Sequence, residues 1–182
     1  MTTTTKIDLP VGTWTLDKAH TSLSFIARHM MVTKVRGSFR AFHGTVDVTE
    51  NPEDSKVAIE IETGSVSTGS ADRDAHLTSP DFFDVANYPA MKFVSTDIRQ
   101  EHGEWRLTGD LTIKDITKPV TLDVSFDGTE TNPWGKEVAA FTATGEVDRE
   151  AWGLTWNVPL ESGGLLVSRK ITLEVDAQLT RD

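Results

Sequence analysis

The chain contains no cysteine, so neither disulfide bonds nor thiol chemistry contributes to its fold or function. It also lacks any run of about twenty apolar residues, the length that a membrane-spanning helix needs. Its first ten residues, MTTTTKIDLP, include one lysine and no apolar run, so they do not resemble a secretory signal. These absences predict a soluble cytoplasmic protein with no stable membrane insertion.

Basic residues are too few for a nucleic-acid-binding protein. Lysine and arginine total 18 against 28 acidic residues, which gives a net charge of −10 at pH 7. Binding to a phosphate backbone requires clustered Lys and Arg, and docking on anionic lipid surfaces is disfavoured for the same reason. The composition therefore predicts no nucleic-acid partner and leaves small molecules, extracted lipids and other proteins.

Alternation of apolar and polar residues with a period of two recurs along most of the chain, as expected for strands with one buried face. With the segments near 35–48 and 91–98 included, about eight strands are predicted, separated by Gly, Pro and Asn turns. The clearest alternating segments are residues 22–29, 57–63, 105–113, 120–126, 141–147 and 171–179. This pattern predicts an all-β fold, a single domain over residues 12–182 and an N-terminal tail over residues 1–11.

The segment from residue 64 to residue 93 interrupts the strand pattern. Ser70 is a predicted N-cap for a short helix through Leu77, and Ser79-Pro80 predicts a second turn that carries Phe82 and Phe83. We therefore expect a short helical insertion near residues 70–85, placed where it can cap a barrel.

Small residues occur on several predicted interior faces, such as Gly109 between Leu107 and Leu111, and Ala143 beside Phe141. One interpretation is that they leave space for a ligand. The other is ordinary interdigitation of large and small side chains, or glycine at a bend of the barrel. The sequence does not decide between them.

The histidines suggest catalysis only weakly. Asp17, His20 and Ser22 have the residue types of a catalytic triad, but the glycine-rich motifs of many hydrolases are missing, so a structural turn is favoured. No pair of histidines has the spacing of a zinc motif, so neither a metal nor a cofactor is predicted.

Two further groups of residues have both a functional and a structural interpretation. Arg73 and His76 share one face of the predicted helix and form either a polar rim for a ligand head group or an ion-pair network that fixes the helix. Trp152 and Trp156 lie beyond Arg149 and would share one face of a strand, either as core or as the wall of a cavity.

The order of motifs along the chain resembles the YceI-like family, lipocalin-like proteins often described as polyisoprenoid-binding. The resemblance covers residues 12–179, nearly the whole chain. The matching motifs are Trp14-Thr15-Leu16-Asp17, His20-Thr21-Ser22, His29-Met30, Val35-Arg36-Gly37, Ser65-Val66-Ser67-Thr68-Gly69, Arg73-Asp74-Ala75-His76-Leu77, Asp81-Phe82-Phe83-Asp84, Tyr88-Pro89, Gly109-Asp110-Leu111-Thr112-Ile113, Lys118-Pro119-Val120-Thr121-Leu122 and Trp152-Gly153.

This resemblance implies a lipocalin-like extended antiparallel barrel of eight strands around an apolar channel, which binds a polyisoprenoid, an isoprenoid quinone or another long-chain lipid without catalysis. Two alternatives stay open, namely an enzyme that acts on an isoprenoid or ester through His and Asp residues, and a stress-related scaffold whose barrel is filled. A homodimer is the default assembly. The expected ligand-binding residues are Leu23, Phe25, His29, Phe39, Arg73, His76, Phe82, Phe83, Leu107 and Phe141.

Overall fold

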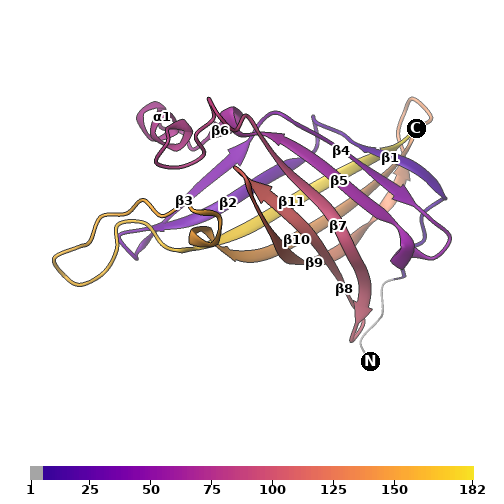
Figure 1. The fold of residues 1–182 in the computed structure, drawn as a ribbon. Coiled ribbons are helices and arrows are strands. Elements are labelled where there is room, and N and C mark those ends of the chain that lie inside the picture. The colour runs from indigo at the N-terminus through magenta and orange to yellow at the C-terminus, as the bar shows by residue number, and fades with distance from the viewer. Residues whose placement is uncertain (1–5) are drawn as a thin grey trace.

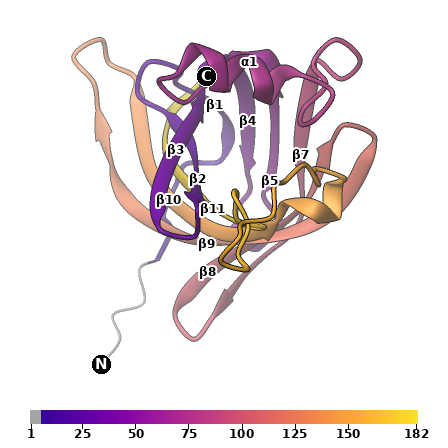
Figure 2. The same cartoon turned by 90° about the vertical axis from the view of Figure 1, so that its left-hand side faces the viewer.

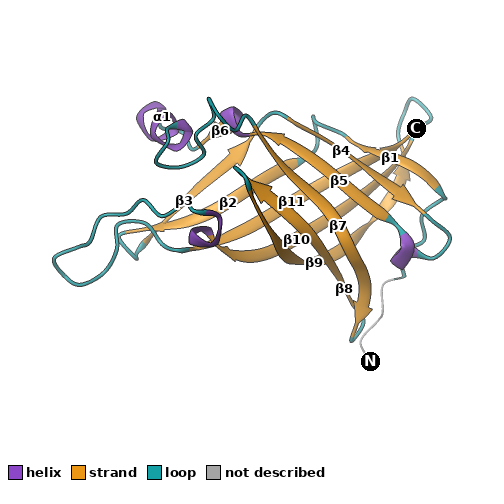
Figure 3. Cartoon of the chain, viewed as in Figure 1, coloured by secondary structure: helices purple, strands orange, loops and turns teal. Residues whose placement is uncertain are grey.

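The computed structural model describes residues 6–182, which form one antiparallel sheet of eleven strand segments and one α-helix (Figures 1 and 3). The strands are β1 (Gly12–Leu16), β2 (Ser22–His29), β3 (Thr33–Phe39), β4 (Phe42–Val48), β5 (Lys56–Glu62), β6 (Val66–Ser67), β7 (Ala90–Glu101), β8 (Glu104–Ile113), β9 (Ile116–Thr131), β10 (Glu137–Asp148) and β11 (Lys170–Arg181). The helix is α1 (Ala71–Thr78), and short 3-10 turns cover Pro52–Asp54, Thr63–Ser65 and Arg149–Trp152.

The sheet closes into a barrel because β11 pairs with β10 on one side and with both β1 and β2 on the other. β1 and β2 follow one path along β11 and act as one long strand, interrupted at residues 17–21. β3 and β4 form a second interrupted strand, which pairs with β2 and β1 respectively. With these mergers and the short β6 set aside, the barrel has the eight strands that the sequence predicts.

The predicted helical insertion lies at the rim of one end of the barrel. The outer edge of β3 pairs with β6, and α1 lies next to β6, along the upper rim of the barrel end that faces the viewer in Figure 2. The Ser70 hydroxyl accepts a hydrogen bond from the Arg73 amide, so the predicted N-cap is confirmed. The turn after Ser79 buries Phe82 and Phe83. No helix in residues 6–182 is both long and apolar enough to cross a bilayer.

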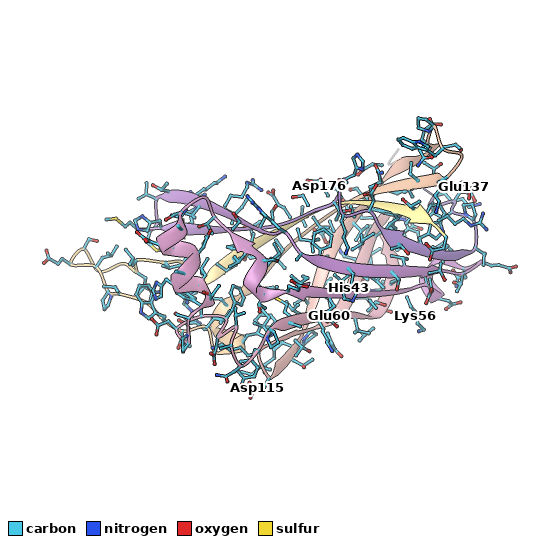
Figure 4. The ribbon with its side chains drawn as sticks, turned by 90° about the horizontal axis from the view of Figure 1, so that it is seen from above. His43, Lys56, Glu60, Asp115, Glu137 and Asp176 are labelled. Carbon is cyan, nitrogen blue, oxygen red and sulfur yellow. The ribbon has the colours of Figure 1, made fainter. Side chains whose placement is uncertain are left out.

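The alternation predicted from the sequence is confirmed strand by strand. On β5, Val57, Ile59 and Ile61 face the interior, whereas Lys56 and Glu60, labelled in Figure 4, lie on the outer face. The same division holds along β8, β9, β10 and β11, where most of the apolar residues line the interior. The interior is therefore apolar over the length of the barrel.

The described part of the predicted N-terminal tail, residues 6–11, packs against one end of the barrel. Leu9 contacts the cluster around the fully buried Trp14, and the indole N–H of Trp14 donates to the carbonyl of Pro10 at 3.1 Å. Residues 1–5, the rest of that tail, lie outside the described part of the chain.

Glycines on the inner faces are covered by neighbouring side chains. A Cβ atom added at Gly109 would lie 2.4 Å from the ring of Phe93 and 2.8 Å from the carbonyl oxygen of Val94. At Gly37 it would meet the ring of Phe25 at 2.2 Å. At these positions the interdigitation interpretation is correct, because each glycine leaves room for an aromatic ring of the neighbouring strand.

This close approach makes Gly109 sensitive to the smallest possible substitution. We expect Gly109→Ala to lower the free energy of unfolding by about 1–3 kcal/mol, because both the ring and the backbone must shift to admit a methyl group. Gly164→Ala is the control, since its added Cβ would meet only the flexible side chains of Met31 and Leu160 at 3.3 Å or more. Urea denaturation of both variants measures the difference, and equal stabilities would contradict the prediction.

Candidate functional site: an apolar cavity with a polar mouth

A cavity of about 710 Å³ occupies the barrel interior. Each residue that the sequence predicted as ligand-binding lies on the wall of this cavity. The apolar members are Leu23, Phe25, Phe39, Phe82, Phe83, Leu107 and Phe141, and the polar members are His29, Arg73 and His76. The seven apolar side chains come from strands far apart in the sequence and from the turn after α1, and they meet because the barrel closes.

Most charged groups on the cavity wall, Arg106 on β8 excepted, lie at the end beside α1, which we call the mouth. Asp72, Arg73 and His76 on α1 contribute to it, with Arg28 and His29 at the end of β2. These side chains lie where the apolar wall ends, so a ligand in the cavity would have its long axis in apolar surroundings and one end near charges.

Arg73 is held by a threonine. Its Nε donates to the Thr68 hydroxyl at 2.7 Å and its Nη2 donates to the Thr68 carbonyl at 2.8 Å. The Asp74 carboxylate accepts hydrogen bonds from both the amide and the hydroxyl of Thr68. Across residues 6–182, no carboxylate lies within 4.0 Å of the Arg73 guanidinium, so the ion-pair interpretation of this arginine is wrong. Its positive charge stays available at the mouth.

His76 lies in an aromatic cluster. Its Nε2 is 2.8 Å from the Asp81 carboxylate, and its ring meets the rings of Phe82 and Trp156 edge-on, at centroid distances of 5.1 and 4.5 Å. This cluster joins α1 to the long loop of residues 153–169. Both Trp152 and Trp156 line the cavity, and Trp152 also belongs to the buried core. Residues 152–156 form no strand, so the shared strand face expected for them is wrong.

Arg149 has a structural role that the sequence did not reveal. It is only 5 % exposed, and its guanidinium donates to the carbonyl oxygens of Ser168, Leu154, Trp156 and Val167 at 2.9, 2.6, 3.0 and 3.3 Å. Burial lowers the pKa of Arg149, and the four carbonyl dipoles stabilise the charge in place of a carboxylate. A single side chain thus fixes both ends of the loop at the mouth.

The candidate triad is a structural turn. Asp17 Oδ2 lies 2.8 Å from His20 Nδ1 and 3.1 Å from Gln178 Nε2, and its other oxygen accepts from the Ala19 amide. Ser22 bonds the hydroxyl of Ser24 instead of His20. His20 is exposed, so these residues connect β1 to β2 without a catalytic arrangement.

This turn should give the protein a measurable acid sensitivity. The hydrogen bond from His20 is the main cause that lowers the pKa of Asp17. A carboxyl group with a lowered pKa in the folded state stabilises the fold above its unfolded pKa of about 3.9, and that contribution is lost as pH falls through the folded value. Because the turn is partly solvated, we expect a loss of about 0.5–1 kcal/mol. The free energy of unfolding of wild type and Asp17→Asn, measured from pH 6 down to acidic pH, tests this loss. Identical pH profiles of the two proteins would contradict the prediction.

Within residues 6–182, no three His, Asp or Glu side chains are arranged to hold a metal ion. The site is therefore described by its apolar cavity, its polar mouth and the loop fixed by Arg149.

These features define a lipocalin-like cavity barrel, a class in which a closed antiparallel sheet surrounds a space for one ligand. The chain belongs to the YceI-like family, because the model of the YceI-like domain matches residues 14–179. A UPF0312 protein of Staphylococcus aureus is 37 % identical over 169 residues, which cover 92 % of this chain and 96 % of that protein.

Solved structures show the same fold. The YCEI protein of Campylobacter jejuni has a TM-score of 0.73 and 25 % identity, with 85 % of this chain and 90 % of that chain covered. A polyisoprenoid-binding domain from Saccharophagus degradans has a TM-score of 0.64 at 11 % identity, with 93 % and 98 % covered. The family predicted from the sequence motifs is thereby confirmed.

Proposed function

We propose that this protein binds a polyisoprenoid or a similar long-chain amphipathic lipid in the barrel, and carries or stores it without chemical change. The observation that carries the proposal is the apolar cavity of about 710 Å³ with most of its charged groups at one end. The Saccharophagus degradans domain of the same fold, described as polyisoprenoid-binding, supports this ligand class. The presence of a cavity argues against a barrel filled by its own side chains.

The apolar wall provides enough driving force for such a ligand. Burial of an apolar chain contributes about 0.8 kcal/mol per methylene, so a chain of roughly twenty carbons contributes about 16 kcal/mol before the costs of ordering are subtracted. A polar ligand would gain none of this and would lose its hydration. The cavity therefore selects for length and apolar character.

We propose that the polar end of the ligand lies at the mouth, near His29, Arg73 and His76. Arg73 offers a cation with no carboxylate of the described residues within 4.0 Å, and His76 offers a ring nitrogen beside the rings of Phe82 and Trp156. This combination suits a small anionic or hydrogen-bonding head group.

Native mass spectrometry of the freshly purified protein tests the proposal, followed by organic extraction and identification of what is released. A stoichiometric long-chain lipid is the expected result. Protein that is empty and also fails to bind added isoprenoid quinones or fatty amides would overturn the proposed function while leaving the fold intact. The same spectra report whether the protein forms the homodimer that we expect by default, because two-fold dimers are the commonest assembly.

The paired His76 and Asp81 favour one competing function, an enzyme that uses this pair as a base at the mouth. Turnover of isoprenoid esters with a pH–rate profile that is lost in His76→Ala would establish it. Extraction of the ligand unchanged after incubation supports the carrier.

A further inference from the structure

An exposed apolar tip extends beyond the mouth. It consists of residues 30–32, in the turn between β2 and β3, and residues 158–166 of the long loop, which extends farthest to the left in Figure 1. The two parts are joined, since the Met30 amide donates to the Leu166 carbonyl at 2.7 Å and Met31 packs beside Gly164. Seven large apolar side chains are exposed in residues 6–182, and four of them are in the tip: Met30, Met31, Val32 and Val158, at 50, 55, 74 and 42 %.

The backbone at this turn is unfavourable for the residues that occupy it. Met30 and Met31 have φ angles of +52° and +62°, and the Val32 amide donates to the His29 carbonyl at 3.1 Å across them. A hairpin turn with two left-handed residues strongly favours Asn and Gly. Two exposed methionines are therefore unfavourable here, both for the backbone conformation and for the contact of apolar side chains with water. Backbone outliers of this kind are concentrated at functional positions.

The charge near the tip is opposite to that of the whole molecule. Exposed Arg28 and Lys34 flank the turn, and the Arg28 guanidinium donates to the Val32 carbonyl at 3.0 Å. Glu161 is the one acidic residue in residues 157–168. In a chain with a net charge of −10, the two basic residues that flank this turn favour its contact with a negative surface, although the net charge alone disfavours such docking.

The tip is continuous with the cavity. Leu166 of the tip lies on the cavity wall, as do Arg28, His29 and Val167, which adjoin the tip. A surface that covers the tip would therefore also lie over the mouth, and a lipid leaving that surface would enter the cavity without crossing water.

We propose that this tip docks on the interface of a lipid bilayer that contains anionic lipids, with Met30, Met31 and Val32 inserted among the head groups and Arg28 and Lys34 at the phosphates. The docking does not depend on the proposed cavity ligand, but the transfer of lipid between membrane and cavity does. Exposed apolar side chains beside basic ones are the composition of segments that bind membranes at the interface.

The turn provides an unusual test, because Met30→Asn with Met31→Gly should improve the fold and impair the docking. We expect this double variant to unfold about 2–4 °C higher than wild type, since Asn-Gly suits the turn. Its affinity for vesicles of phosphatidylcholine and phosphatidylglycerol in equal parts should fall at least about tenfold, as two apolar side chains are removed. Trp134→Ser is the control, because it removes an 85 % exposed apolar residue from the turn between β9 and β10 and should leave vesicle affinity unchanged.

A second measurement uses the absence of native cysteine. A polarity-sensitive fluorophore on Val32→Cys should shift to the blue with these vesicles and be quenched by spin-labelled lipids, whereas the same fluorophore on Trp134→Cys should not respond. Wild-type affinity in the double variant, or no response at Val32, would overturn the proposal. So would a dimer that dissociates in the double variant without vesicle binding by wild type, because the tip would then bind a second copy. Lipid extraction from the same samples separates a failure of docking from a failure of the cavity.

Discussion

Replacing Ala27 and Ala143 together with phenylalanine is expected to abolish retention of a long-chain ligand while the barrel stays folded. Both alanines lie on the cavity wall, Ala27 on β2 towards the mouth and Ala143 on β10 opposite Val175. Two rings at these levels exclude about four methylenes of a bound chain. At about 0.8 kcal/mol each, the loss is about 3 kcal/mol, or more than hundredfold in affinity.

The control for this experiment is Ala58→Phe, which places the same ring on the outer face of β5. Ala58 is exposed and lies between Val57 and Ile59, which face the cavity. Ligand per protein, quantified after organic extraction, should match wild type in the control and approach zero in the double variant. Retention of the ligand by a folded double variant would show that the ligand binds elsewhere.

The interior wall was predictable because strand alternation is a local property. Val57, Ile59 and Ile61 are separated by residues that face outward, so the sequence alone places them on one face. How the inner glycines are covered was not predictable. Phe93 on β7 covers Gly109 on the neighbouring strand β8. The register that brings these two residues together depends on the irregularity in β7 between Ser95 and Asp97.

Arg149→Met should destabilise the protein by about 3–4 kcal/mol, the second large effect that we expect. The substitution keeps an apolar stem of similar length but leaves four carbonyl oxygens at the base of the loop without their donor. Because these carbonyls belong to residues 154–168, the loop should open before the barrel does. Denaturant unfolding measures the loss, and limited proteolysis should show faster cleavage within residues 153–169.

Arg169→Met is the matched control. Arg169 is 55 % exposed and makes surface ion pairs with Asp148 and Glu150, so its loss should cost less than about 1 kcal/mol. If the two variants were equally stable, the carbonyl cluster would contribute little and the loop would be held by Trp156 and its neighbours instead.

The contrast between these two arginines also shows what limited the prediction of the site. Arg73 and His76 are three residues apart on a helix, so a sequence pattern brings them together. The partners of Arg149 are backbone carbonyls, which every residue carries, and they converge only when the loop folds back. Exposure of Met30 and Met31 was equally hidden, because their apolar character suggests burial.

The pairing of β1 with β11 has a consequence for how the chain folds during its synthesis on the ribosome. Leu16 pairs with Leu179, so the first strand to be synthesised waits for the last before its edge is covered. Contacts of such sequence separation slow folding and leave hydrogen-bonding edges exposed in the meantime. The barrel therefore remains open until β11 has been synthesised, and the strands made before it are the part most in need of protection by a chaperone.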